Sequence, residues 1–269
     1  MPEGHTLHRL AKLHQRRYAG APVRVASPQG RFAAEAALLD GLVLTSAEAY
    51  GKHLFHNYGP RGTVHVHLGL YGTFAEAVLP EGDVVGQVRM RLSGRTHWTD
   101  LRGPTRCELL TEDEAEAIKE RLGPDPLRAD AKPELAWQRI SRSRTSIAAL
   151  LMDQKVLAGV GNVYRAEVLF RQGIAPMVPG RSLDGALWND VWTDLAALMR
   201  AGVRSGRIDT VADEHLPEVT GRAPRQDRHG GEVYVYRRAG LPCLVCGTPV
   251  AHKELAGRNL YWCPACQPD

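Results

Sequence analysis

The segment CLVCGTPVAHKELAGRNLYWCPAC, residues 243–266, fixes part of the fold by itself. It contains two Cys-x2-Cys pairs separated by sixteen residues, and the cysteines are Cys243, Cys246, Cys263 and Cys266. Each pair can aim two thiolates at one point from a tight turn, and the intervening residues have the length of a β-hairpin. Because four cysteine ligands leave no open coordination position, we expect a structural zinc ribbon; two redox-active Cys-x2-Cys motifs are the alternative.

The composition is that of an ordinary globular chain with room for two domains: 269 residues, of which 43% are hydrophobic and 24% charged. No window approaches the ~20 apolar residues of a membrane-spanning helix, and the first residues lack the apolar core of a secretory signal. We therefore expect a cytoplasmic protein. Without export, the five cysteines argue against a disulfide framework, and we expect Cys107 to be a buried thiol.

The charge is mildly basic and unevenly distributed. The chain has 34 basic and 30 acidic residues, a net charge of +4 and a pI of about 8.9. Residues 112–134 are mainly acidic, whereas residues 137–171 are mainly basic. This pattern suits a protein with one face toward a polyanion, although two solvated helix faces would give the same pattern.

The chain predicts an α+β protein of two domains. The amino-terminal part alternates short apolar runs with Gly and Pro, which is typical of an antiparallel β-sandwich. Apolar spacing and the Thr111–Glu114 capping box predict two flanking helices. The expected strands are residues 22–26, 42–47, 54–58, 63–68, 84–92 and 97–100, and the expected helices are residues 6–18 and 111–122.

Beyond residue 122 the pattern becomes helical. Helices are expected at residues 134–142, 146–151, 160–172 and 183–205, followed by a polar mobile loop at residues 209–231 and a strand at residues 233–237. The expected organisation is a β-sandwich domain at residues 1–122, a linker at residues 123–133, a helical domain at residues 134–232 and the zinc ribbon at residues 233–269.

The first residues could carry chemistry. Removal of Met1 would leave Pro2 with a secondary amine, which can attack an electrophilic carbon and form an iminium. Glu3 would be placed for proton transfer or for stabilising a developing cation, and Gly4 gives the backbone room to fold into a pocket. On this motif alone, a frayed chain end is the alternative.

Three motifs together resemble one family. The start MPEGHT, the segment LMDQKVLAGVGNVYRAEVLF at residues 151–170 and the end YWCPACQ are similar to the formamidopyrimidine-DNA glycosylase and endonuclease VIII family. The resemblance runs the length of the chain, with the motifs in the family's order. It implies a carboxyl-terminal domain with a helix-two turns-helix element and a zinc-ribbon hairpin. It also implies Pro2 as nucleophile, Glu3 as acid–base group and Lys52, in GKHL, as a cation at the lesion's phosphate or sugar oxygen.

The resemblance also implies contacts to DNA. Gly159 and Gly161 would let a turn approach the backbone, although an ordinary helix–helix turn also uses such glycines. The phosphate contacts implied are Lys155, Asn162 and Arg258, and the side chains implied to fill the space of an extruded nucleotide are Leu70 and Tyr71, for which a core strand end is the alternative.

Two positions depart from the family pattern. Gly69 replaces a polar residue, so contacts to the orphaned base would be weaker or come from elsewhere, such as Arg106. Thr6 replaces a second glutamate, as in an actinobacterial-type endonuclease VIII subgroup, which leaves open whether His5 substitutes for it.

The resemblance therefore predicts a bifunctional DNA glycosylase and abasic-site lyase. It would remove oxidised bases, mainly pyrimidines, through a Pro2 Schiff base followed by β,δ-elimination. It would bind damaged DNA as a monomer, with one structural zinc ion and no redox or nucleotide cofactor. The alternatives are a non-catalytic zinc-ribbon protein that binds bent, gapped or abasic DNA, and an RNA-associated ribbon protein.

Overall fold

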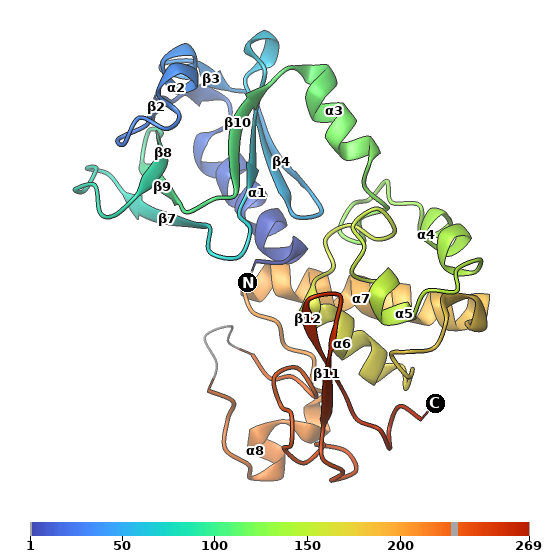
Figure 1. Ribbon diagram of the computed structural model, residues 1–269. Coiled ribbons are helices and arrows are strands. Elements are labelled where there is room, and N and C mark those ends of the chain that lie inside the picture. Colours follow the sequence, from blue (N-terminus) through green and yellow to red (C-terminus); the bar gives the residue numbers. More distant parts are fainter. Residues whose placement is uncertain (1, 227–230, 269) are drawn as a thin grey trace. The chain divides into compact units, whose positions relative to one another are not determined.

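The computed structural model describes residues 2–226 and 231–268, and the chain divides into two compact units, residues 1–121 and 122–269 (Figure 1). Met1 and residues 227–230 of the expected mobile loop lie outside the described residues, as does Asp269. In the described part of the chain, every helix is too short or too polar to span a bilayer.

Unit 1 is the expected β-sandwich with flanking helices. Its helices are α1 (Gly4–Tyr18), α2 (Ala33–Leu39), η1 (Gly59–Arg61) and α3 (Glu112–Glu120). Its strands are β1 (Ala21–Pro22), β2 (Arg24–Ala26), β3 (Val43–Leu44), β4 (Ser46–Tyr50), β5 (His53–Asn57), β6 (Thr63–His67), β7 (Thr73–Val78), β8 (Val88–Ser93), β9 (His97–Arg102) and β10 (Arg106–Leu110). The Thr111–Glu114 capping box that opens α3 is confirmed.

Within residues 2–121, two antiparallel four-stranded sheets have the orders β10-β6-β5-β4 and β2-β8-β9-β7. Their facing side chains and the apolar side of α1 share one core, whose buried members include Leu7, Leu54, Val66, Met90 and Leu101. Alternation along β6 divides its residues between the two faces of its sheet, so the register decides which histidines share a face.

A buried polar network ties α1 to both sheets. Glu76, on β7, accepts from Arg17 at 2.6 Å and from Tyr18 Oη at 3.0 Å, and lies 2.7 Å from His14 Nε2. His14 Nδ1 lies 2.9 Å from His56 Nε2 on β5. Burial alone would raise the pKa of Glu76, but His14 and Arg17 lower that pKa to about 2.

Glu76→Gln is expected to destabilise unit 1 by about 2 kcal/mol at pH 7, because charged hydrogen bonds are replaced by weaker neutral ones. The ordinary pKa of the carboxyl is 4.5, so the difference between wild type and variant should be complete above that pH and should vanish as pH falls through about 2. Urea unfolding followed by β5 and β7 amide signals measures it. An equal difference at pH 7 and pH 2 would contradict this assignment.

Unit 2 joins the helices and the ribbon in one core. Its elements are α4 (Pro133–Ile140), α5 (Ile147–Leu150), α6 (Asn162–Arg171), η2 (Gly180–Ser182), α7 (Gly185–Ser205), η3 (Asp213–His215), α8 (Pro217–Thr220), β11 (Ala251–Leu255) and β12 (Arg258–Trp262). Buried Trp188, Tyr164 and Leu195 share this core with Leu260 and Cys263 of the ribbon. The ribbon is therefore packed into the helical unit.

The prediction of a strand at residues 233–237 is wrong. These residues form no strand, because their backbone groups bond to a side chain. Glu167, fully buried on α6, accepts from the N–H groups of Tyr234, Val235 and Tyr236 at 2.7, 3.0 and 2.8 Å. A carboxylate thus satisfies donors that a neighbouring strand would otherwise have bound.

Candidate active site and nucleic-acid interface

The amino end of α1 carries the first candidate residues. Glu3 is the N-cap residue of α1 and is fully buried, and Pro2 before it is half-buried. The Glu3 carbonyl accepts from the Thr6 N–H at 2.9 Å. A helix amino end favours a negative charge, so this position suits a carboxylate. His5 is also buried, and burial lowers its pKa to about 4, so its ring is neutral at pH 7.

Lys52 lies in the tight turn between β4 and β5. Tyr50 pairs with His53, which leaves Gly51 and Lys52 as the loop residues of a two-residue hairpin. Gly51 has φ of 57°, the positive value that such a turn requires at its first loop position. The turn therefore presents Lys52 at the end of the sheet.

A hydrogen bond joins the carboxyl-terminal part of α1 to this hairpin. Gln15, near the carboxyl end of α1, accepts from the Ala47 N–H of β4 at 2.7 Å. Ala47 lies near the end of the hairpin that is remote from Lys52. Figure 1 shows the amino end of α1 and the turn between β4 and β5 at the same end of unit 1, and these two segments carry Pro2, Glu3 and Lys52.

The loop after β6 starts at this same end. His67 pairs with His53, and His67 Nδ1 accepts from the Gly69 N–H at 3.2 Å. Leu70 and Tyr71 follow at the loop tip, where they are 48% and 85% exposed. Two large side chains this open to water are unusual for a β-sandwich core and are available for contact with a partner.

Gly69 cannot be replaced easily. Its φ is 67°, and a Cβ there would lie 1.9 Å from Thr105 Oγ1. Thr105 in turn donates its N–H to the His67 carbonyl at 2.9 Å, so it is held in place. The structure therefore explains why this chain has no side chain at position 69.

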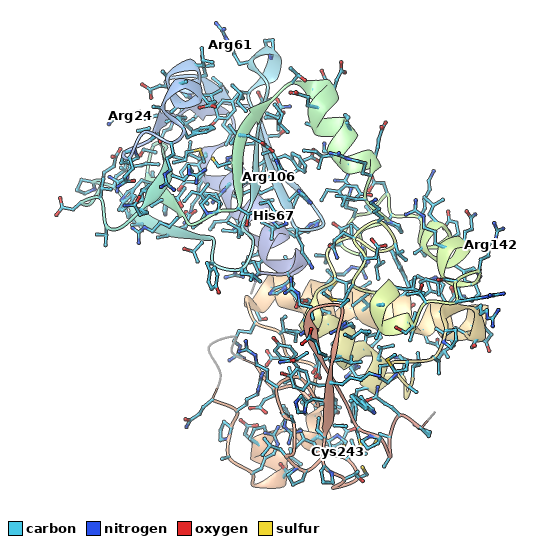
Figure 2. The ribbon with its side chains drawn as sticks, viewed as in Figure 1. Arg24, Arg61, His67, Arg106, Arg142 and Cys243 are labelled. Carbon is cyan, nitrogen blue, oxygen red and sulfur yellow. The ribbon has the colours of Figure 1, made fainter. Side chains whose placement is uncertain are left out.

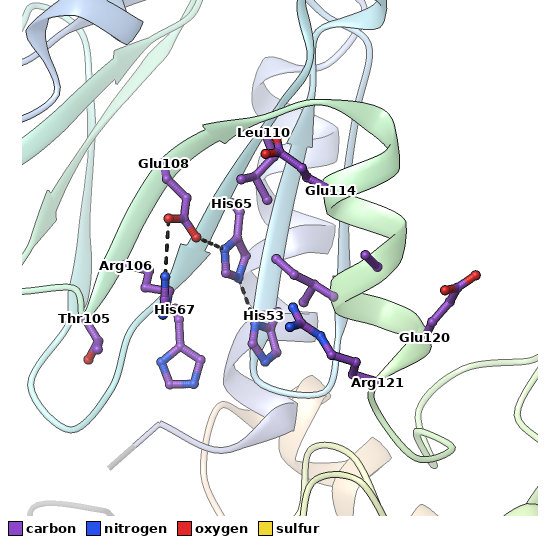
Figure 3. A pocket seen from close by; sticks show the side chains of 12 residues that line it. His53, His65, His67, Thr105, Arg106, Glu108, Leu110, Glu114, Glu120 and Arg121 are labelled. Carbon is purple, nitrogen blue, oxygen red and sulfur yellow. Dashed lines mark hydrogen bonds and ion pairs between the residues drawn. The ribbon is translucent and has the colours of Figure 1, made fainter.

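A cavity of about 820 Å³ lies between the β10-β6-β5-β4 sheet and α3 (Figure 3). Its lining combines histidines, apolar side chains and charges of both signs: His53, His65, His67, Thr105, Arg106, Glu108, Leu110, Glu114, Ala117, Ile118, Glu120 and Arg121. His67 and Arg106 are cross-strand partners at one end of it (Figures 2 and 3). These histidines were not among the expected site residues, although their alternation in β6 places His65 and His67 on one face.

In unit 2, Asn162 joins the turn before α6 to the ribbon. Its Nδ2 donates to the Asn259 carbonyl at 2.9 Å, and its Oδ1 accepts from Arg165. Both polar groups of the Asn162 side chain are therefore engaged within the protein. Arg258, beside Asn259, follows the ribbon turn, where Ala256 and Gly257 have φ of 51° and 71°. The expected phosphate contacts Asn162 and Arg258 are thus close together.

Lys155 is exposed in the turn segment between α5 and α6. Its backbone N–H donates to Asp153 Oδ1 at 2.9 Å, which holds the turn while the side chain extends into solvent. Unit 2 therefore contains all three expected phosphate contacts, Lys155, Asn162 and Arg258.

The four paired cysteines form a metal site. Their sulfur atoms lie within 4.8 Å of one another, with Sγ–Sγ separations of 3.9 Å for Cys243–Cys266 and 3.5 Å for Cys246–Cys263. Zn–S bonds of about 2.3 Å in a tetrahedron require sulfur separations of roughly 3.8 Å. The cluster therefore fits a zinc ion with four thiolate ligands, as the spacing predicts, and Cys107 stays outside it.

Family models match most of the chain. The formamidopyrimidine-DNA glycosylase N-terminal domain matches residues 1–107, the H2TH domain of the same glycosylase matches residues 122–213, and a zinc finger found in FPG and IleRS matches residues 240–268. These matches cover both units, including the ribbon.

Individual proteins similar to this chain carry the names of the same family. "Endonuclease 8 1" of Mycobacterium tuberculosis is 55% identical, over 99% of this chain and 100% of the relative. The formamidopyrimidine-DNA glycosylase of Bdellovibrio bacteriovorus is 32% identical, over 85% of this chain and 83% of the relative. Among solved structures, Lactococcus lactis Fpg in complex with DNA containing an abasic site has a TM-score of 0.79 at 20% identity, covering 99% of this chain and 100% of that one. That structural likeness supports the fold.

Proposed function

Because the chain belongs to the formamidopyrimidine-DNA glycosylase and endonuclease VIII family of base-excision repair enzymes, we propose that it excises oxidised bases from DNA and cleaves the resulting abasic site through Pro2. The observation that carries this proposal is the common location of Pro2, Glu3 and Lys52 at one end of unit 1. An amine, a buried carboxylate and an ammonium group are the parts that imine chemistry on a sugar needs.

The proposed reaction begins when the Pro2 nitrogen attacks the anomeric carbon of an extruded nucleotide. The bond to the base breaks, the base leaves with the bonding electrons and a proton, and an iminium forms. Glu3 transfers protons during ring opening and elimination, and Lys52 contacts a phosphate or sugar oxygen. Removal of a C2′ proton breaks the C3′–O3′ bond, and removal of a C4′ proton then breaks the C5′–O5′ bond. Phosphate remains at both ends of the gap, and water hydrolyses the iminium to release the unsaturated sugar from Pro2.

The proposed substrates are oxidised pyrimidines. The name of the mycobacterial relative, Endonuclease 8 1, supports this preference, whereas other relatives carry the formamidopyrimidine-DNA glycosylase name. Cleavage rates on matched duplexes containing thymine glycol, dihydrouracil, 8-oxoguanine or an abasic site test it. Faster excision of 8-oxoguanine than of either pyrimidine lesion would contradict the proposed preference.

Each unit carries residues that we propose contact DNA. Lys155, Asn162 and Arg258 would bind backbone phosphates, and Leu70 with Tyr71 would occupy the space of the extruded nucleotide. The exposure of the two loop residues and of Lys155 supports these roles. For Asn162 to reach a phosphate through Nδ2, it would have to exchange its bond to the Asn259 carbonyl.

Lys155→Ala is expected to weaken DNA binding about equally on damaged and undamaged duplexes. The slope of log K against log salt should become less negative by about 1, since one phosphate contact is lost. Fluorescence anisotropy between 50 and 200 mM salt, as a working range, measures both effects. Lys132→Ala, which removes an exposed lysine from the start of α4, is the matched control. Equal slopes for the two variants would exclude the proposed contact.

The proposed chemistry uses groups from one chain and needs no cofactor besides the structural zinc. We therefore propose that the enzyme acts as a monomer, in the bacterial cytoplasm where its DNA substrate lies.

Borohydride reduction in the presence of an abasic or lesion-containing duplex tests the proposed function, because it converts the iminium into a stable adduct. We expect one covalent protein–DNA adduct, located by mass spectrometry on the peptide that begins at Pro2. Tight binding without an adduct would favour the alternative, a zinc-ribbon protein that recognises bent, gapped or abasic DNA without catalysis.

A further inference from the structure

A chain of hydrogen bonds runs along the cavity wall from Glu108 through His65 to His53 (Figure 3). His65 Nδ1 lies 3.0 Å from Glu108 Oε1, and His65 Nε2 lies 2.8 Å from His53 Nδ1. The His53 and His65 rings are stacked, with centroids 5.0 Å apart, and Phe55 stacks on His65. The rings are therefore held by packing as well as by hydrogen bonds.

The hydrogen bonds define the tautomers of both rings. A carboxylate only accepts, so His65 Nδ1 carries the proton and His65 Nε2 is an acceptor. His53 Nδ1 must then donate, which leaves His53 Nε2 as an acceptor. Burial lowers the pKa of His53 to about 3 and also lowers that of His65, so both rings are neutral at pH 7.

The series of hydrogen bonds ends at His53, which is next to Lys52 in the sequence. His53 follows Lys52 directly and begins β5, so the ring that Glu108 and His65 hold is the first anchored side chain after the turn. Burial is the main cause of the lowered pKa of His53 and of His67, and the Lys52 charge lowers both values further, so Lys52 lies within electrostatic reach of this cluster.

We propose that Glu108, acting through His65 and His53, is a positioning residue for Lys52 in the reaction. This inference rests on the proposed function. The hydrogen bonds hold the His53 ring in one tautomer and one orientation, which fixes the start of β5 directly after Lys52. Without Glu108, His65 can turn or change tautomer, His53 loses its ordered partner, and the Lys52 turn gains alternative conformations. The loss should appear in the chemical step. Glu108 also accepts from Arg106 at 3.4 Å, so the affinity is measured alongside the rate to detect any effect through that residue.

The test compares Glu108→Ala, Glu108→Gln and Glu120→Ala with the wild type. Glutamine keeps an acceptor oxygen for His65 Nδ1, whereas alanine removes it. Glu120 lines the same cavity but lies outside the hydrogen-bonded chain, so it is the matched control. Single-turnover cleavage of an abasic duplex gives the chemical rate, and anisotropy with a tetrahydrofuran-containing duplex gives the affinity.

We expect Glu108→Ala to slow single-turnover cleavage about 10- to 100-fold, the range for misplacement of a reacting group, with affinity changed less than about threefold. Glu108→Gln should recover most of the rate, and Glu120→Ala should match the wild type. Histidine nitrogen NMR should show Nδ1–H tautomers for His53 and His65 in the wild type and loss of that state for His65 in Glu108→Ala. Thermal unfolding of each variant measures any general destabilisation.

Wild-type rate in Glu108→Ala, or a glutamine variant as slow as the alanine variant, would overturn the inference. Nε2-protonated His65 in the wild type would do the same. Failure of the proposed function is a separate outcome, since then the wild type itself would form no adduct with abasic DNA under borohydride. An adduct in the wild type with unchanged Glu108→Ala kinetics would reject the positioning role alone.

Discussion

An extra residue placed before Pro2 is expected to lower base excision and borohydride trapping at least about 10³-fold. The extension turns the Pro2 nitrogen into a tertiary amide, which has no nucleophilic lone pair and cannot form an iminium. Losses of this size are typical when a nucleophile is removed. The measurements are single-turnover excision of a thymine glycol lesion and adduct formation on an abasic duplex.

The control for this variant is the same residue added after Asp269, which should leave both rates unchanged. Affinity for a tetrahydrofuran duplex is measured alongside, because an extension could also hinder access of DNA to the site. A fall in rate without a comparable fall in affinity assigns the effect to chemistry. Trapping of the amino-terminally extended chain at the wild-type rate would mean that another amine, such as Lys52, forms the iminium.

Cys263→Ser is expected to release zinc, to unfold the ribbon and to weaken DNA binding about 100-fold. Cys263 is fully buried in the core that the ribbon shares with α6 and α7, so its loss removes a metal ligand and disturbs the packing of unit 2. Arg258 would no longer be held beside Asn162, and lost phosphate contacts lower affinity steeply. Zinc content and anisotropy measure the two effects.

Unit 1 should stay folded in this variant, because its core contains none of the ribbon residues. Amide signals of β5 and β7 check this expectation. Cys107→Ser, which changes a cysteine outside the cluster, should keep zinc and affinity. Full zinc content in Cys263→Ser, or unchanged affinity in a zinc-free protein, would contradict a structural role for the metal.

Local signals in the sequence predicted those elements that depend on neighbouring residues. The α3 cap lies within four residues of sequence, and the cysteine spacing carries the geometry of a tetrahedral site. Helix α1 was also expected, although it starts at Gly4 rather than at residue 6. These features need no information from distant parts of the chain.

Elements that depend on distant partners were missed. Strand β7 has Glu76 in its centre, which breaks the apolar alternation, and only the contacts with α1 explain a carboxylate there. Helix α2 and strand β10 were not expected, and residues 84–87 of an expected strand lie before β8. Residues 233–237 alternate like a strand, but the partner of their amides is Glu167, more than 60 residues earlier.

The candidate site likewise contains residues that the sequence indicated and contacts that only the folded structure shows. Family motifs indicated Pro2, Glu3 and Lys52, whereas the histidine chain could not be read from spacing, because it depends on the β5–β6 and β6–β10 registers. The engagement of Asn162 with Asn259 is likewise a contact between segments about 100 residues apart, and only the folded chain shows it.

The close approach of Thr105 to Gly69 also limits how this loop can evolve. A single change that gives position 69 a side chain meets the Thr105 hydroxyl and a backbone angle unfavourable for L-residues. A polar residue at position 69 can be tolerated only after a smaller residue has replaced Thr105 and the loop backbone has changed its conformation. Position 69 is therefore held at glycine by epistasis, and any new side-chain contact of this loop must arise through mutations at other positions.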